Sequence, residues 1–517
     1  MSQFWVRRCG LSGRFRAVVS CSMVLVALVT GCSKSENGRR AASATSRATT
    51  TLPTPPSPPA LLWAPCADVG ESAECATLTV PLDYSHPNAK TISVVLSRIK
   101  ATATDRLGVL LFNPGGPGIS GLSLPADLVS QAAASPTDLA MFSRFDLIGF
   151  DPRGTGRSTA VDCGDPTASD QVDYSPETPD EMEALKTTMR AFAESCASRS
   201  GALLPFVGTI NAARDLDQMR QALGEEQLNL FGFSYGTELF GAYADLFPKR
   251  VRTALLDGPV PSVDSGMGFF RGQADALEEQ FGKFLERCSS RTDCALSASG
   301  VPAVVYDDVI ARWDQKPPIL PSGEPLTASQ VSTVAANGTY GPGAERLVEA
   351  GIAQAAAGET SALEVGWNVY MDITPGKRSN AWAATVAINC ADYRWPAAET
   401  MFADAVTSQE AADPRMGEAF LREYLPCAYW PFGGAAPHTR IAKGSPPILV
   451  VGTTNDPATP FAGAKALAGQ LDNAVLLTRD GFGHTAWRRS ACIRATAGTY
   501  LLTGATPAPG TICPSDT

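Results

Sequence analysis

The sequence is poor in histidine and in basic residues, and it lacks the closely spaced cysteine pairs that bind zinc. Only His86, His438 and His484 occur, and no two cysteines are separated by just two residues. The sequence thus argues against structural zinc and indicates no other cofactor. The 42 Lys and Arg are outnumbered by 52 Asp and Glu, which gives a net charge of -10. An acidic surface of this kind argues against nucleic-acid partners.

Long apolar runs are also missing, apart from one near the start. Four arginines precede an apolar stretch from Ala17 to Val29, and Thr30-Gly31-Cys32 follows it. A basic segment, a short apolar stretch and a small-residue cleavage site are typical of a secretory signal, here residues 1–31, and the run is too short to span a membrane. The cysteine directly after the cleavage site favours a lipoprotein signal with lipid on Cys32, although an ordinary cleaved signal stays open.

Residues 32–60 contain almost nothing apolar and are rich in Ser, Thr and Pro. Such a segment cannot bury enough surface to fold, so we expect a semi-extended tether between the lipid anchor and the domain. The predicted protein is exported, anchored to the outer face of the cytoplasmic membrane and monomeric.

Ten of the 13 cysteines remain once Cys9, Cys21 and Cys32 are set aside. An even number in an exported chain indicates disulfides. Pairing of sequence neighbours is the simplest arrangement, although ten cysteines allow about 900 connectivities. The neighbouring pairs are Cys66 and Cys75, Cys163 and Cys196, Cys288 and Cys294, Cys390 and Cys427, and Cys492 and Cys513.

Apolar runs rich in Val, Leu, Ile and Phe alternate with helix-like segments from residue 75 onward. The first two runs predict an antiparallel pair, and each later run predicts a strand that leads into a loop. Continuous apolar runs are typical of strands buried on both faces, so we expect an α/β fold with a mostly parallel sheet flanked by helices. The runs are residues 75–84, 91–99, 108–118, 145–156, 228–236, 252–260, 446–456 and 474–484.

Ser234 stands in Gly-Phe-Ser-Tyr-Gly, between a predicted strand and a predicted helix that ends before Pro248. A nucleophilic serine at such a turn has a strained backbone, and side chains at Gly232 or Gly236 would crowd it. The five-residue pattern is weak evidence alone. It gains weight because a strand precedes it and a helix follows it.

His484 and Asp456 are the residues that would complete a catalytic triad. His484 follows the last predicted strand, and Asp456 ends the strand before it. The chain order Ser234, Asp456, His484 is that of the α/β-hydrolase triad. Asp257 is a rival acid, and Asp480 is interpreted as a turn residue. We interpret Thr459 as a structural helix cap, with Pro460 opening the helix that follows.

Glycine-rich loops follow two of the strands. Residues 112–118, Phe-Asn-Pro-Gly-Gly-Pro-Gly, come after the third strand, where backbone amides can stabilise an oxyanion. The amide of Tyr235 with that of Gly116, or alternatively Gly115, is the predicted pair. Residues 151–158 are interpreted as a structural loop, since they lack the lysine and the helix of a phosphate site.

Five segments together resemble the actinobacterial tripeptidyl aminopeptidases, relatives of prolyl aminopeptidases, and the related mycobacterial envelope carboxylesterases and proteases. The resemblance covers roughly residues 61–515 and implies the α/β-hydrolase fold with Ser234, Asp456 and His484 as the triad. Asn113 departs from the wider pattern, in which a histidine opens the glycine loop, and this weakens inferences about proline specificity. The segments are residues 113–118, 145–158, 213–224, 232–248 and 452–493.

Residues 261–445 lack the strand-to-loop rhythm and carry helical patterns. In this fold, an insertion after the sixth strand forms a helical lid that controls entry. The hydrolase core is then residues 61–260 and 446–517. Enzymes that act at a free amino terminus need acids to hold the ammonium group, and the lid candidates are Asp392, Glu364 and Asp372.

Three functions are compatible with these residues. The first is a serine exopeptidase that releases short amino-terminal fragments through an acyl-enzyme. The second is a carboxylesterase or lipase that uses the same triad on acyl esters. The third is a lid-bearing binding protein with a decayed site, which the presence of all three triad residues disfavours. The expected partner is therefore a peptide or ester substrate.

Overall fold

The computed structural model describes residues 52–515, except for 262, 264, 321–322, 375–376, 399, 401–414 and 435–438. The predicted signal, Cys32 and most of the tether lie outside the described residues. Residues 52–60, the described end of the tether, form neither helix nor strand. Among the described residues, no helix combines the length and the apolar character needed to cross a bilayer.

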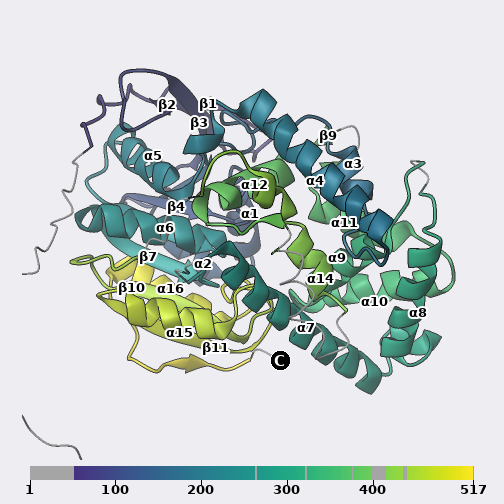
Figure 1. Ribbon diagram of the computed structural model, residues 1–517. Coiled ribbons are helices and arrows are strands. Elements are labelled where there is room, and N and C mark those ends of the chain that lie inside the picture. The colour runs from purple at the N-terminus through teal and green to yellow at the C-terminus, as the bar shows by residue number, and fades with distance from the viewer. Residues whose placement is uncertain are drawn as a thin grey trace, which may run out of the picture. The chain divides into compact units, whose positions relative to one another are not determined.

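One mixed sheet of ten strands organises the described chain (Figure 1). Its first members pair antiparallel, as predicted, and the strands from β5 onward pair parallel. In spatial order the strands are β1 (Ala64–Pro65), β2 (Glu74–Pro81), β3 (Thr91–Ile99), β5 (Asp146–Asp151), β4 (Val109–Asn113), β6 (Leu228–Phe233), β7 (Val251–Asp257), β10 (Ile448–Asn455), β11 (Ala474–Phe482) and β12 (Ile512–Cys513).

Side chains of the central strands alternate between two hydrophobic cores. In β4, Val109 and Leu111 join one core, and Leu110 and Phe112 join the other. All four are buried, as a parallel strand covered on both faces requires. The first core also contains residues of α5 (Thr209–Ala222), α6 (Tyr235–Leu246) and α15 (Phe461–Gln470). The second contains residues of α1 (Leu124–Ala132), α2 (Pro136–Phe142) and α16 (Ala491–Thr503).

The chain between β7 and β10 is mainly helical, and we call it the helical insertion. Residues such as Phe281, Val331 and Ile352 form a hydrophobic core of its own. A short ladder of β8 (Ile373–Thr374) and β9 (Lys377–Arg378) accompanies the helices. Its described helices include α7 (Gly266–Ser290), α8 (Pro302–Gln315), α9 (Ala328–Gly338), α10 (Pro342–Ala356), α11 (Ser361–Tyr370), α12 (Ala381–Asp392) and α14 (Gly417–Arg422).

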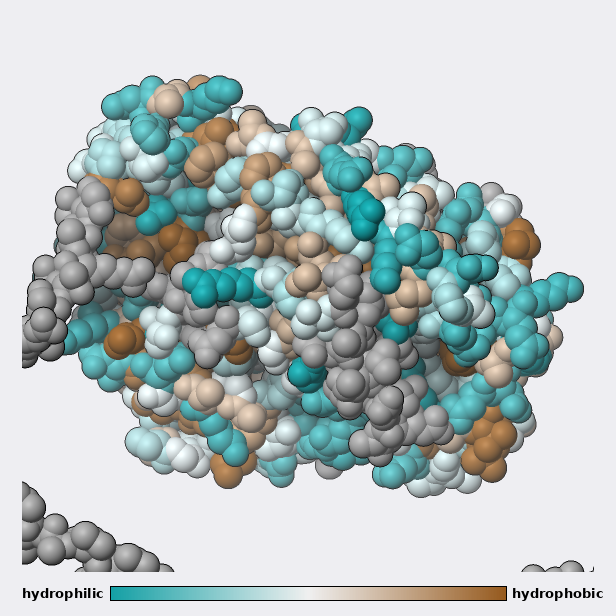
Figure 2. Space-filling model, in the orientation of Figure 1, coloured by the Kyte–Doolittle hydropathy of each residue, from teal (hydrophilic) through white to brown (hydrophobic). Residues whose placement is uncertain are grey.

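One long helix outside the insertion packs with it. α4 (Pro179–Ser200) lies between β5 and β6 in the sequence, yet its Leu185 and Met189 share a core with Phe270 and Tyr424. Figure 2 shows hydrophilic side chains along the outer ridge that α4 forms. The helix therefore presents a polar face to solvent and packs its apolar face against residues of the helical insertion.

The ten cysteines form five disulfides, and each pairs with its sequence neighbour as predicted. Cys390 and Cys427 join α12 to the segment after α14, so this bridge closes a loop within the helical insertion. Cross-links of this kind stabilise a fold mainly by restricting the unfolded chain.

Candidate active site

The register of the sheet brings the predicted residues to one edge. Asn113 pairs with Gly232, Phe233 pairs with Asp257, and Asn455 pairs with Phe482. The carboxyl ends of β4, β6, β7, β10 and β11 therefore lie side by side, where ligands bind in open parallel sheets.

Ser234 stands at the turn between β6 and α6 with a φ of 53° and a ψ of -126°. A non-glycine residue at positive φ is strained, and its amide is held by the carbonyl of Asp257 at 2.9 Å. A Cβ on Gly232 would come within 2.5 Å of the Gly236 backbone, and one on Gly236 within 2.7 Å of the Asn113 carbonyl. Both glycines are thus required by close approach, as the sequence pattern predicted.

His484 contacts Asp456 through one ring nitrogen. Its Nδ1 lies 2.9 Å from Oδ1 and 3.1 Å from Oδ2 of Asp456. The Asp456 side chain is fully buried, and it also accepts hydrogen bonds from the amides of Ala458, Thr459 and Thr485. This network fixes the carboxylate and leaves Nε2 of His484 as the ring nitrogen available for proton transfer.

The rival acid Asp257 is occupied elsewhere. Its carboxylate accepts hydrogen bonds from the amides of Ala486 and Trp487 at 2.8 to 3.1 Å. Burial raises the pKa of Asp257 to about 6. Asp257 therefore anchors the segment that follows His484, whereas Asp456 holds the imidazole.

Two structural interpretations from the sequence are wrong. Asp480 is not in a turn: it lies within β11, where it accepts a hydrogen bond from Thr454 because the strand continues to Phe482. Thr459 is not the cap of α15, since Pro460 holds that position. Its hydroxyl instead lies 3.4 Å from Nδ1 of His484.

No hydrogen bond is formed between the Ser234 and His484 side chains, both of which the structure describes. Gly258 is a neighbour of His484, because a Cβ on it would come within 3.2 Å of His484 Cε1, and it follows Asp257, whose carbonyl accepts the Ser234 amide. Thr459 lines the same cavity as Ser234 and contacts His484. Links of this kind are commonly open in a site without substrate.

The glycine loop after β4 supplies one free amide and one that is used. Gly115 donates its amide to the side chain of Asn113 at 3.0 Å. Among the described residues, the amides of Gly116 and Tyr235 have no acceptor, and both residues line the cavity above Ser234. Of the two pairs considered from the sequence, the geometry therefore favours Gly116 with Tyr235.

The second glycine loop, at residues 151–158, is structural. Arg153 is fully buried, and its guanidinium contacts both carboxylate oxygens of Asp215 at 2.7 and 2.5 Å. The Asp151 carboxylate accepts hydrogen bonds from Ser120 and from the Gly121 and Arg157 amides. The Arg153 guanidinium and the Gly121 and Arg157 amides are thus used within the protein, as expected for a loop that holds the chain in place.

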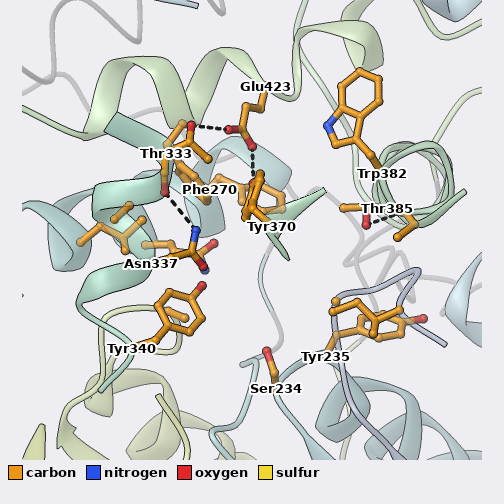
Figure 3. A pocket seen from close by; sticks show the side chains of 18 of the residues that line it. Ser234, Tyr235, Phe270, Thr333, Asn337, Tyr340, Tyr370, Trp382, Thr385 and Glu423 are labelled. Atoms are coloured by element: carbon orange, nitrogen blue, oxygen red, sulfur yellow. Dashed lines mark hydrogen bonds between the residues drawn. The ribbon is translucent and has the colours of Figure 1, made fainter. Parts of the chain in front are cut away.

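A cavity of about 440 Å³ opens above Ser234 and extends into the helical insertion. Figure 3 shows Ser234 and Tyr235 on its floor, Tyr340 and Asn337 on one wall, and Trp382 and Thr385 on the opposite wall. Glu423 lies at the far end from Ser234. The volume is in the range of sites for small ligands or short peptide segments.

Glu423 is the acid that the sequence did not single out. Its carboxylate accepts hydrogen bonds from the hydroxyls of Tyr370 at 2.9 Å and Thr333 at 3.2 Å. Among the described residues, no Lys, Arg or His pairs with it, and burial raises its pKa to about 7. A buried carboxylate in a cavity without a countercharge is a candidate binding group for a cation.

Glu238 also lines the cavity, but its charge is balanced. It accepts hydrogen bonds from Arg440 at 3.0 Å and from the Tyr393 hydroxyl at 2.9 Å. Glu238 therefore needs no ligand cation, in contrast to Glu423.

The three acids predicted to hold a substrate amine do not line the cavity. The Asp392 carboxylate is taken up by the amide and hydroxyl of Thr209 at 2.7 and 2.6 Å. Asp372 is exposed, and Glu364 lies half-buried on α11. Burial and the nearby Glu238 charge raise the pKa of Asp392 to about 7. The Asp392 carboxylate thus fixes Thr209, whose hydroxyl contacts the Tyr235 hydroxyl at 2.6 Å.

The described residues contain no cluster of three or more His, Cys, Asp or Glu side chains that could hold a metal ion. The chemistry available at this site is that of a serine, an imidazole, carboxylates and backbone amides.

Comparisons with known proteins agree with this geometry. A family model described as alpha/beta hydrolase fold matches residues 108–307, and one described as TAP-like protein matches residues 413–513. The tripeptidyl aminopeptidase of Streptomyces coelicolor is 34% identical over 470 residues, which cover 87% of this chain and 85% of that protein. The serine protease Hip1 of Mycobacterium tuberculosis is 33% identical, with 87% and 90% covered. Carboxylesterase B of the same species is 32% identical, with 86% and 88% covered. The chain is a hydrolase and belongs to the α/β-hydrolase family that these three proteins represent.

Proposed function

We propose that this hydrolase is a serine peptidase that releases tripeptides from the free amino terminus of peptides through an acyl-enzyme. The observation that carries the proposal is Glu423, a buried carboxylate without a cation partner among the described residues, at the opposite end of the cavity from Ser234. A substrate ammonium group would supply the missing charge. The relatives named tripeptidyl aminopeptidase and serine protease support the same function.

In the proposed reaction, the Ser234 hydroxyl attacks the scissile carbonyl and His484 Nε2 takes its proton. This step requires a hydrogen bond between Ser234 and His484, which forms when substrate binds. Asp456, held on Nδ1, keeps the imidazole in the correct tautomer and stabilises the imidazolium that forms.

The negative charge that develops on the carbonyl oxygen is stabilised by the amides of Gly116 and Tyr235. These donors have no other acceptor among the described residues, so they need no reorganisation during the reaction. His484 then gives its proton to the leaving amine and the acyl-enzyme forms. Water, deprotonated by His484, hydrolyses the ester to the tripeptide acid and restores Ser234.

The remaining assignments concern the chain around the site. Residues 261–445 act as the lid that controls entry, and residues 61–260 and 446–517 form the hydrolase core. Residues 1–31 direct export, Cys32 carries lipid, and residues 32–60 tether the enzyme to the cell envelope. Five disulfides support an oxidising compartment.

A carboxylesterase is the second candidate, because one relative carries that name and the cavity walls include Phe269, Phe270 and Trp382. The same triad would transfer an acyl group from an ester to water. Glu423 argues against this alternative, since an acyl chain offers nothing to a carboxylate.

Activity on two substrate classes separates these candidates. The purified exported chain is tested on a tripeptide p-nitroanilide with a free amine and on short-chain p-nitrophenyl esters, with Ser234→Ala as the blank. We expect amide hydrolysis that depends on Ser234 and on a free amino terminus. Turnover of the esters without turnover of any tripeptide amide would reject the peptidase in favour of the esterase.

A further inference from the structure

Two asparagines line the cavity and are not used by the mechanism above. Asn337 belongs to α9 and Asn389 to α12, which carry residues on opposite walls (Figure 3). Asn389 is only 4% exposed, and Asn337 is half-buried. Carboxamides in such positions are costly to desolvate unless they have partners.

Each of the two asparagine side chains makes only part of the hydrogen bonds that its carboxamide can form with the described residues. Asn337 Nδ2 donates to the Thr333 carbonyl, and Asn389 Nδ2 donates to the Thr385 carbonyl, each at 2.9 Å. No described residue donates to either Oδ1 atom. One N–H and the acceptor oxygen of each carboxamide are therefore available to a ligand.

Their positions relate to the two ends of the cavity. Thr333, one helical turn before Asn337, contacts Glu423, and Tyr340, three residues after it, holds the His484 amide through its carbonyl at 3.0 Å. Four residues of helix rise about 6 Å, the length of about two extended residues. Asn337 thus lies between the proposed ammonium site and the reacting end.

Asn389 is related to the glycine loop through Thr385. Thr385, one turn earlier, donates its hydroxyl to the carbonyl of Pro117 in the glycine loop at 2.5 Å. The carboxamide of Asn389 is therefore held one turn away from the loop that supplies the oxyanion amide.

We propose that Asn337 and Asn389 bind the backbone peptide groups of the substrate between its ammonium group and its scissile carbonyl. A carboxamide offers one donor and one acceptor, which matches a peptide group in an extended chain. An acyl chain would leave both carboxamides unpaired, so these residues select peptides over esters. The proposal rests on the peptidase function and adds the recognition of the peptide backbone.

The test compares Asn337→Leu and Asn389→Leu with Asn368→Leu, a control on α11 outside the cavity. Leucine keeps the approximate volume and removes the carboxamide. The substrates are a free-amine tripeptide p-nitroanilide, its analogue with one internal peptide N–H replaced by an ester oxygen, and a short-chain p-nitrophenyl ester. Thermal melting checks that each variant is folded.

We expect each cavity variant to lose about tenfold in kcat/KM on the tripeptide anilide and nothing on the short ester. The control should lose nothing on either substrate. At least one variant should lose less on the analogue, which already lacks the contact. Unchanged tripeptide hydrolysis in both variants, or an equal loss on tripeptide and ester, would overturn the proposal. If Asn389→Leu does not fold, Asn337→Leu decides alone. A wild-type enzyme that cleaves no tripeptide amide would instead reject the peptidase function.

Discussion

The two ends of the cavity are built in different ways. The Ser234 end is made by strand termini and glycine turns, where the backbone itself fixes the proposed nucleophile and the proposed oxyanion amides. The Glu423 end is made by side chains from separate helical segments, where the Tyr370 and Thr333 hydroxyls hold the carboxylate. The comparison teaches that the chemistry depends on sheet register, whereas selectivity depends on side-chain pairing that can change without altering the sheet.

The largest expected effect is at the sheet end. Ser234→Ala should reduce kcat by about 10⁵- to 10⁶-fold on amides and esters alike, because both substrate classes need the nucleophile. Steady-state kinetics on an amide and an ester substrate measures this loss. In a separate experiment, the wild type is labelled with a fluorophosphonate probe, and mass spectrometry should find the label on Ser234. Labelling of a different serine would contradict the assignment.

Variants of the two acids near His484 test which of them supports catalysis at the Ser234 end of the cavity. Asp456→Asn should lower kcat by about 10³- to 10⁴-fold, because the imidazole loses its carboxylate partner. Asp257→Asn should cost far less activity, since Asp257 accepts only the Ala486 and Trp487 amides. Kinetics of both variants at one pH compares them, and a larger loss in Asp257→Asn would reverse the acid assignment.

The pH dependence of activity distinguishes the Glu423 end of the cavity from the Ser234 end. Glu423 must be ionised to hold an ammonium group, and burial raises its pKa to about 7. The ratio of wild-type to Glu423→Gln kcat/KM on a free-amine tripeptide should therefore fall several-fold from pH 8 to pH 6. Taking the ratio cancels the titration of the triad, which both proteins share. A ratio that stays constant over this range would argue against ionised Glu423 in binding.

The smallest expected effect is on protein stability, where Glu423→Gln should bring a gain instead of the loss expected for activity. The folded state raises the pKa of Glu423 from 4.5 to about 7, so it binds the proton more tightly than the unfolded chain does. The contribution of this residue to stability therefore falls as pH rises from about 4.5 to 7, by up to about 3 kcal/mol. Glu423→Gln should raise Tm by a few degrees at pH 8 and leave it unchanged near pH 4.5. Calorimetry at both pH values measures this, with Glu364→Gln as a control.

At the Ser234 end of the cavity, the strands, the turn at Ser234 and the contact between Asp456 and His484 agree with the sequence prediction, because the signals are local and the geometry is general. Apolar runs located the strands, and parallel strands bring their carboxyl ends together, so Ser234, Asp456 and His484 could be expected to meet. Neighbouring cysteines predicted all five disulfides. Only details of the turns failed, where Thr459 and Asp480 depend on where a strand or helix ends.

The helical end could not be predicted in the same way. Glu423 lies in a segment without a periodic signal, and its partners stand 53 and 90 residues away in the sequence. Asp392 was one of the acids predicted to hold the substrate amine, but its carboxylate is used by Thr209. The packing of α4 with residues of the insertion also depends on long-range contacts. None of these pairings follows from hydrophobic periodicity.

The most direct test of the two-ended cavity is a cycle that crosses Glu423→Gln with acetylation of the substrate amine. The quantity measured is kcat/KM on a tripeptide p-nitroanilide, with Glu364→Gln as the matched lid control. Acetylation and Glu423→Gln should each cost about 100-fold alone and little more together, because both remove the same ion pair. Independent, multiplicative losses, or a Glu423→Gln enzyme that still prefers the free amine, would contradict the account.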